Sequence, residues 1–312
     1  MRVASLAVYQ TLLKYDSERN AVIKRKTEEL SSGKSILYPS DEPVDFARSL
    51  RLKRFSQKLE RLNKNIDVVS SYLDTAESSL ASAVNTLQEV RVKFVQLLNT
   101  GVMTQDEAQT LSNYLEEMRN YILQLGNEKV GDAYIFGGVK TQSPPFADDG
   151  SYQGETAETT VPVAAGVELN TNFDGSQYFA VNQVSGKVLA VEVIDKIREI
   201  IDSGELSRLH TDTIEVDLGD GTQEVSLLEA YDMALSKMMT YRSIVGTKQQ
   251  VASNLKFQNE SMDLRLKELD SKLTDADYPQ AIAELEKAKT AYEALMAAIA
   301  QVQNLSLLEF IK

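Results

Sequence analysis

The chain of 312 residues is 43% apolar and 25% charged, and it contains neither cysteine nor tryptophan. Without cysteine, disulfide bonds, thiolate nucleophiles and cysteine-ligated metals are excluded. The net charge of −13 is unevenly spread: residues 1–64 carry 14 Lys and Arg against 8 Asp and Glu, whereas residues 145–230 carry 4 against 17. The acidic middle argues against binding to nucleic acid.

No segment has the composition of a membrane span or a cleavable signal. The first ten residues lack the unbroken apolar core of a secretory signal peptide. No stretch approaches 18 uncharged apolar residues. We therefore expect no membrane insertion and, if the protein leaves the cell, another route of export.

Residues 3–31 predict a helix with two adjacent apolar stripes, which needs more than one neighbour for full burial. We expect this helix to end near Gly33, because glycine readily adopts the left-handed conformation at a helix end. A turn over residues 38–43 follows. There Ser40 or Asp41 can cap the next helix, and Pro43 suits its first turn.

The longest periodic stretch runs from Leu52 to Leu97. Fourteen successive positions at spacings of three and four are apolar, and neither Gly nor Pro interrupts the 46 residues. A sustained seven-residue repeat predicts a coiled-coil rod of about 69 Å with one or more partner helices. A long helix in an ordinary bundle is the weaker alternative.

A third helix is predicted behind Thr104 and Glu107, which have the spacing of a capping box. Apolar residues keep the three-four spacing until the helix ends between Gly126 and Gly131. Because the connecting loop is short, we expect this helix to pack antiparallel on the rod.

Residues 138–224 interrupt the helical period and predict a small β-containing insertion. Short runs at 159–163 and 177–181 are rich in Val, Thr, Tyr and Phe, which is typical of strands. Residues 187–202 predict a helix. Alternation at 213–218 and 222–226 around a glycine-containing turn predicts a hairpin.

The seven-residue repeat returns from Leu227 to Leu273 and predicts a second rod. Two positions of this apolar seam are polar, Lys248 and Asn259. If Asn259 is buried, it fixes the register of the paired helices; the alternative is that the seam is exposed to solvent there. Gly246 costs about 1 kcal/mol relative to Ala unless close packing requires it. The predicted coiled-coil core comprises Leu59, Leu62, Ile66, Val69, Leu73, Leu80, Leu87, Leu255, Met262, Leu266 and Leu269.

We therefore predict a mainly α fold, a long antiparallel coiled-coil bundle with a small β-containing insertion. Terminal assembly helices would comprise residues 1–43 with 277–312, the core 44–137 with 225–276, and the variable surface insertion 138–224. Neither terminal helix is expected to be stable alone in water. The predicted assembly interface comprises Leu6, Tyr9, Leu13, Ile23, Leu30, Leu285, Tyr292, Leu295, Ile299, Val302 and Leu305.

No arrangement of polar residues indicates catalysis, so we expect neither an enzyme nor a cofactor. Residues 33–35 match the end of a phosphate-binding loop, but Glu28 stands where that loop requires glycine. His210 is the only histidine, so no metal site is expected there. The acidic residues at 217–224 lack calcium-loop spacing and favour a solvated hairpin.

Several short motifs together resemble the bacterial flagellin family. They are Leu-Ser-Ser-Gly-Lys at 30–34, Tyr-Pro-Ser-Asp-Glu-Pro at 38–43, Gly-Asp-Ala-Tyr-Ile-Phe-Gly-Gly at 131–138, Asp-Ala-Asp-Tyr at 275–278 and Leu-Ser-Leu at 305–307. The runs at 36–41 and 136–146 are more similar to the hook-associated members than to filament flagellins. The resemblance covers both ends and both rods but not the insertion.

The resemblance implies a structural subunit at the hook–filament junction. Its expected partners are a hook-side junction protein, flagellin, copies of itself and an export chaperone. It would leave the cell unfolded through the flagellar type III apparatus, without a cleavable signal peptide, and order its terminal helices on assembly. Filament flagellin itself and an intracellular coiled-coil scaffold are the alternatives.

Overall fold

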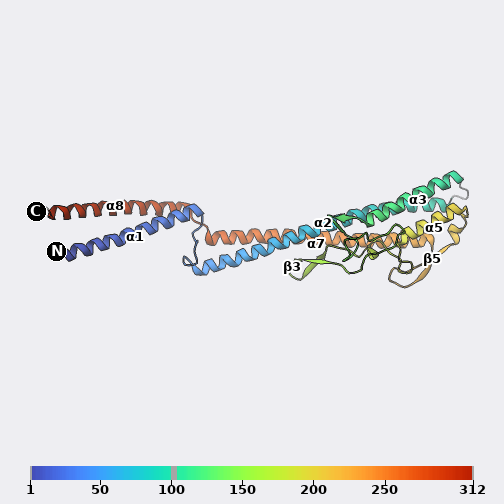
Figure 1. Ribbon diagram of the computed structural model, residues 1–312, viewed down its shortest axis with the longest axis horizontal. Coiled ribbons are helices and arrows are strands. Elements are labelled where there is room, and N and C mark those ends of the chain that lie inside the picture. Colours follow the sequence, from blue (N-terminus) through green and yellow to red (C-terminus); the bar gives the residue numbers. More distant parts are fainter. Residues whose placement is uncertain (1, 100–103, 311–312) are drawn as a thin grey trace. The chain divides into compact units, whose positions relative to one another are not determined.

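The structure, a computed structural model, describes residues 2–99 and 104–310 (Figure 1). Within these ranges it describes the side chains of all residues except 2–9, 105 and 302–310. This part of the chain is mainly helical, which confirms the predicted fold class. The long helices are α1 (Arg2–Ser32), α2 (Pro43–Asn99), α3 (Gln105–Gly126), α7 (Leu227–Thr274) and α8 (Tyr278–Phe310).

The described residues between α3 and α7 form short elements. The helices there are α4 (Gly175–Tyr178), α5 (Leu189–Ser203) and α6 (Arg208–Thr211). The antiparallel strand pairs are β1 (Lys129–Val130) with β2 (Ala133–Tyr134), β3 (Thr160–Ala164) with β4 (Val167–Asn170), and β5 (Thr213–Val216) with β6 (Gln223–Ser226). The predicted hairpin is confirmed, with Thr213 opposite Ser226.

The chain divides into two compact units. Unit 1 comprises residues 1–59 and 261–312, and unit 2 comprises residues 60–260. The long helices α2 and α7 contribute to both units. The three-part division made from the sequence stays a prediction.

The helix ends follow the local chemistry of the sequence. Gly33 ends α1 with a φ of +71°, and its N–H donates to the Glu29 carbonyl at 2.9 Å. At the start of α3, the Thr104 N–H donates to the Glu107 carboxylate at 2.9 Å, and the Glu107 N–H donates to the Thr104 hydroxyl. The predicted C-terminal glycine and the predicted capping box are both confirmed.

The strand predicted at 177–181 is wrong. Asp174 accepts a hydrogen bond from the Ser176 N–H at 3.0 Å, and this N-cap starts the short helix α4. The aromatic side chains that suggested a strand are buried against Phe136 instead. His210 lies in α6.

In unit 2, α2 and α7 run antiparallel and share a buried row of side chains, the core row. It comprises Ile66, Leu73, Leu80, Leu87 and Phe94 on α2, and Tyr231, Met238, Val245, Ala252 and Asn259 on α7. The members on each helix are seven residues apart, as the repeat predicts. The ion pairs Arg242–Glu77 at 2.8 Å and Lys256–Asp67 at 2.6 Å join the two antiparallel helices beside the row.

A third layer covers this helix pair in unit 2. Helix α3 lies along α2 and α5 packs on α3 through Arg119–Asp195 at 2.7 Å and Arg198–Glu116 at 2.7 Å (Figure 1). The α5 side chains that face inward are fully buried. Unit 2 is therefore a layered helical domain rather than a bare pair of helices.

Candidate assembly interface

The second row of the seven-residue repeat, which runs in steps of seven from Phe55 to Leu97 on α2 and from Leu227 to Leu269 on α7, is buried or half-buried in unit 2 and exposed in unit 1. On α2 it is buried from Val69 to Leu97, but Phe55 is 44% exposed. On α7 it is buried at Leu227 and Ala234, half-buried at 241–255, and exposed in unit 1. A helix pair buries both rows fully only where another element covers its flank.

The predicted coiled-coil core divides in the same way. Leu59, Ile66, Val69, Leu73, Leu80, Leu87 and Leu266 are buried, and Leu62 and Leu255 are half-buried. Met262 and Leu269 differ from the prediction, because 39% and 50% of their surface is exposed. Both belong to the second row, and no described residue forms a third layer over them in unit 1.

Asn259 resolves an alternative that the sequence left open. Its side chain is buried, and its amide donates to the Asn63 side-chain oxygen at 3.0 Å. The interpretation of an exposed seam at this position is therefore wrong. A hydrogen-bonded Asn pair in an otherwise apolar row specifies one register of the two helices.

Lys248, the other polar seam position, donates hydrogen bonds to residues of the insertion. Its ammonium donates to the Asn170 side-chain oxygen at 2.8 Å and to the Tyr178 hydroxyl at 3.4 Å. Burial lowers its pKa, and the nearby Glu158 opposes that change. The side chain thus joins α7 to the end of β4 and to α4.

Helices α1 and α8 pack side by side and antiparallel in unit 1 (Figure 1). The small side chains Ala281 and Ala288, seven residues apart, are buried between them. The larger apolar side chains described on these two helices are half-buried or exposed. The described large apolar side chains that remain exposed on these helices are Leu13, Tyr15, Val22, Tyr278, Ile282 and Met296.

The predicted assembly residues fall into three groups by burial. Leu13 is exposed, whereas Ile23, Leu30, Leu285, Tyr292, Leu295 and Ile299 are half-buried. The positions of Leu6, Tyr9, Val302 and Leu305 lie outside the residues whose side chains are described. The described members therefore form an apolar surface that one chain leaves partly open.

Where α1 ends and α8 begins, the two chain segments that connect these helices to α2 and α7 pair with each other. The Ser35 N–H donates to the Thr274 carbonyl at 2.8 Å, and the Ala276 N–H donates to the Gly33 carbonyl at 2.9 Å. Lys34 lies opposite Asp275 in this antiparallel bridge. We call the paired segments 33–36 and 274–276 the junction.

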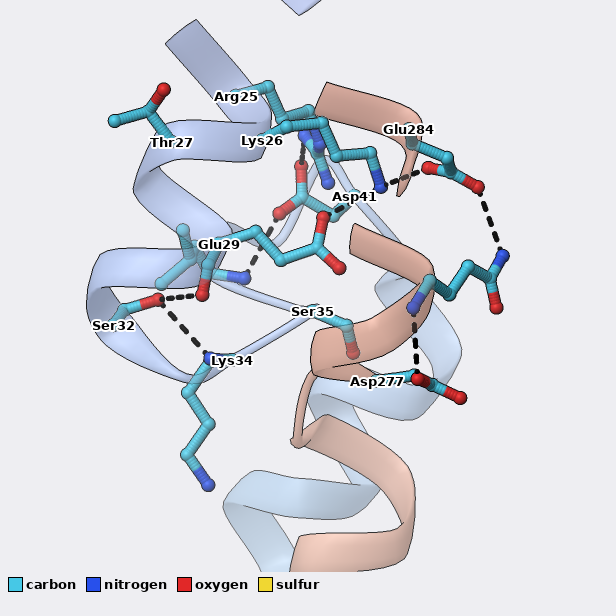
Figure 2. A network of polar contacts seen from close by, with 12 residues as sticks. Arg25, Lys26, Thr27, Glu29, Ser32, Lys34, Ser35, Asp41, Asp277 and Glu284 are labelled. Carbon is cyan, nitrogen blue, oxygen red and sulfur yellow. Dashed lines mark hydrogen bonds and ion pairs between the residues drawn. The ribbon is translucent and has the colours of Figure 1, made fainter. Parts of the chain in front are cut away.

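Charged side chains reinforce the junction from several elements (Figure 2). Lys34 donates to the Thr274 hydroxyl at 3.1 Å and forms an ion pair with Asp275. On α1, Lys26 contacts Glu29 at 2.8 Å and Glu284 of α8 at 2.7 Å. The whole set joins α1, α8 and the 33–42 turn.

Asp41 holds the turn of residues 37–42 against α1. Its carboxylate accepts from Arg25 and from the backbone N–H groups of Leu37 and Tyr38 at 3.0 Å each. These bonds, that of Arg25 first, hold the pKa of Asp41 down to about 2. Tyr38 itself is 54% exposed.

The sequence pattern did not identify these polar residues as a group. Gly33 and the 274–279 break were identified as helix ends, but nothing local indicates that two segments about 240 positions apart meet. One available signal was the placement of Lys34 and Asp275 beside those two breaks. Opposite charges at two helix ends that must come together suggest an ion pair.

Other kinds of site find no support in the described residues. No group of three or more His, Asp or Glu lies close enough there to hold a metal ion. Within the same part of the chain, no helix combines the length and the apolar composition needed to cross a membrane. The acidic hairpin turn is closed by Asp217, which accepts from the Gly219 N–H at 2.8 Å.

Models of a known family match the helical parts of the chain. The bacterial flagellin N-terminal helical region matches residues 3–141, and the bacterial flagellin C-terminal helical region matches residues 228–311. The chain belongs to the bacterial flagellin family. The predicted family is thereby confirmed, and the unmatched residues 142–227 include most of the insertion.

Full-length relatives narrow the similarity within this family. The flagellar hook-associated protein 3 of Escherichia coli is 23% identical over 323 aligned positions, which cover 100% of both chains. A putative flagellar hook-associated protein from Vibrio parahaemolyticus has a similar fold, with a TM-score of 0.62 and 17% identity over 75% of this chain and 100% of its own. Bacillus cereus FlgL also has a similar fold, with a TM-score of 0.58 and 20% identity over 70% of this chain and 98% of its own.

Proposed function

We propose that this flagellin-family chain is a structural subunit of the bacterial flagellum, the adaptor that joins the hook-side junction protein to the flagellin filament. The observation that carries the proposal is similarity along the full length to proteins named flagellar hook-associated protein 3. This similarity covers 100% and 99% of the chain, and it therefore includes the insertion.

The terminal helices supply a physical reason for assembly. Leu295 and Ile299 on α8 are half-buried against α1 in the single chain. Burial of apolar surface contributes about 25 cal/mol per Å², so neighbouring subunits that cover this surface would stabilise both helices. The proposed assembly interface comprises Leu6, Tyr9, Leu13, Ile23, Leu30, Leu285, Tyr292, Leu295, Ile299, Val302 and Leu305.

The proposed partners are the hook-side junction protein, flagellin and further copies of this chain. Export would use the flagellar type III route with a chaperone, and the protein would act outside the cell. We propose neither catalysis nor a cofactor for it, and neither nucleic acid nor a lipid bilayer as a partner.

Two variants test the proposal in flagellated cells. Leu295→Asp and Ile299→Asp are expected to abolish filament attachment and motility while unit 2 stays folded, because a charge would enter the covered surface. Glu293→Gln, an exposed polar change on the same helix, is the matched control and should swim normally. Unaltered motility in both aspartate variants would contradict the assembly role.

Labelling and polymerisation separate the alternatives. Gold-labelled antibody to the chain should mark one narrow zone between hook and filament. If purified chain extends filament seeds without limit, it is a filament flagellin instead. If it is a stable dimer whose α1 and α8 are fully protected from hydrogen exchange, the intracellular scaffold is correct.

A further inference from the structure

The junction lies at the end of α1 and just before the start of α8. All of its contacts are made within one chain. Two backbone hydrogen bonds cross it, Ser35 N–H to Thr274 at 2.8 Å and Ala276 N–H to Gly33 at 2.9 Å. A third hydrogen bond runs from the Ser35 hydroxyl to the Thr274 carbonyl at 3.2 Å. These bonds align the two connecting segments before any other subunit is present.

The side chains extend this alignment into the terminal helices. Lys34 pairs with Asp275 across the junction. About two helical turns earlier on α1, Lys26 joins this helix to Glu284 of α8 (Figure 2). Glu29, which shares Lys26, is buried. The ion pairs Lys14–Glu18 and Lys24–Glu28 lie within α1 and do not reach α8.

The apolar contact between the two helices does not define a register by itself. The buried Ala281 and Ala288 of α8 are seven residues apart and the half-buried Leu295 continues the repeat, so a shift of one helix by a heptad would again place apolar side chains at the contact. Specific polar contacts distinguish such registers. Of the described contacts, those at the junction and at Lys26 are the ones that do so.

We propose that the junction is a clamp that sets the register of α1 on α8, so that pairing of the terminal helices starts there and extends toward both chain ends. Helix formation is limited by its first turn, and a closed end removes the entropy of bringing two helices together. Order in the isolated chain would therefore decrease with distance from the clamp. The inference concerns the single chain and does not depend on the proposed function.

Hydrogen exchange on the full-length purified chain tests the clamp. In the unaltered chain, amides of residues 23–32 and 278–288 should be the most protected of the terminal helices. Lys34→Glu places two carboxylates opposite each other and should speed exchange in both stretches about tenfold. Lys34→Ala, which adds no repulsion, should give a smaller increase, about threefold.

Charge reversal and a control complete the test. The double variant Lys34→Glu with Asp275→Lys restores the opposite charges and should return exchange to near its original rate. Lys64→Glu, which breaks the exposed Lys64–Glu60 pair of unit 2, should change nothing in the terminal helices. Protection of the core row in unit 2 reports whether each variant has folded.

Several results would overturn the clamp. One is unchanged exchange in α1 and α8 of both single variants. Another is exchange in the reversed pair as fast as in Lys34→Glu. A third is equal protection of residues 10–20 and 23–32 in the unaltered chain, because then order would not start at the junction.

Discussion

The parts of the α2–α7 pair in unit 2 and in unit 1 carry the same heptad repeat but differ in burial. In unit 2 the second row is covered at Val69, Ala76 and Ala83, whereas in unit 1 Phe55 and Leu269 are exposed. The apolar pattern is equally regular in both places. The difference therefore comes from the third layer, α3 and the insertion, and not from the helices themselves.

Polar contacts do not explain the difference between the units. In unit 1 the hydroxyl groups of Ser49 and Ser56 donate hydrogen bonds to aspartates of α7. In unit 2 the guanidinium of Arg91 donates to Asp232 at 2.8 Å and that of Arg242 donates to Glu77. Partly exposed pairs of this kind contribute about 0–1 kcal/mol each. A heptad repeat therefore predicts the helix, whereas the number of elements packed against that helix decides how many of its apolar side chains are buried.

The largest expected effect is the loss of stability when a leucine of the heptad repeat is replaced by Asp in unit 2 rather than in unit 1. Leu80→Asp places an unpaired charge in the fully buried core row and should destabilise the chain by about 4 kcal/mol or more, enough to unfold unit 2. Leu269→Asp, the same substitution in unit 1, should change the free energy of unfolding by about 0.5 kcal/mol or less. Urea denaturation followed by circular dichroism measures both.

Equal losses of stability in these two variants would break the comparison. A large loss in Leu269→Asp would mean that the second row is covered in solution in unit 1 as well. Leu269→Ala is the milder companion, and it should be as stable as the unaltered chain.

The Asn pair gives the next largest effect. Asn63→Leu removes the acceptor and leaves the buried Asn259 amide without its partner, which should cost about 1–3 kcal/mol. Asn63→Leu with Asn259→Leu replaces both partners and should recover most of that loss or exceed the original stability. Denaturation of the single and double variants gives the coupling energy. Additive effects of the two substitutions would contradict a direct bond.

Heptad periodicity predicted the long helices well because their periodic side chains bury against neighbours along much of their length. The second rod was expected from Leu227 to Leu273, and α7 spans Leu227–Thr274. The same pattern could not show that Met262 and Leu269 lack a third neighbour, since burial depends on elements distant in sequence. For Asn259 the deciding fact is its partner Asn63 on the other rod.

The insertion shows where local propensity fails. Tyr178 and Phe179 favour a strand, but they follow the Asp174 cap and pack into an aromatic cluster at the end of a short helix. Ala180 adopts a φ of +52°, a strained value that the surrounding packing imposes. Burial of the aromatic rings outweighs the intrinsic preference for strand.

Gly246 offers a smaller test of what covers α7. No heavy atom of the described residues lies within 4 Å of a Cβ built on it, so close packing in the single chain does not require glycine. Gly246→Ala should therefore raise the free energy of unfolding by about 0.5–1 kcal/mol, because alanine loses less backbone entropy in a helix. Thermal denaturation of the monomer measures the gain. A loss would show that another surface approaches this helix face closely in solution.

The smallest effect at neutral pH concerns Asp41 in unit 1. Its pKa is about 2 in the folded chain, below the ordinary 3.8, so the stability it contributes is present above about pH 4 and is lost as the pH falls through about 2. Lys26 and Lys34 likewise lower the pKa of Glu284 and Asp275, respectively. Acid should therefore loosen these contacts of unit 1 only below about pH 4.

Carbon-13 NMR of the Asp41 carboxyl group tests this directly. Arg25→Gln removes the largest cause of the shift, so the titration midpoint should rise toward 3.8 while the turn persists through the Leu37 and Tyr38 N–H groups. Arg48→Gln, which removes an exposed partner of Asp45 on α2, is the matched control and should leave the Asp41 midpoint in place. An Asp41 midpoint already near 3.8 in the unaltered chain would mean that Arg25 does not hold the turn in solution. The turn of residues 37–42 would then be attached to the rods alone, and α1 would lose one of its described anchors beside the junction.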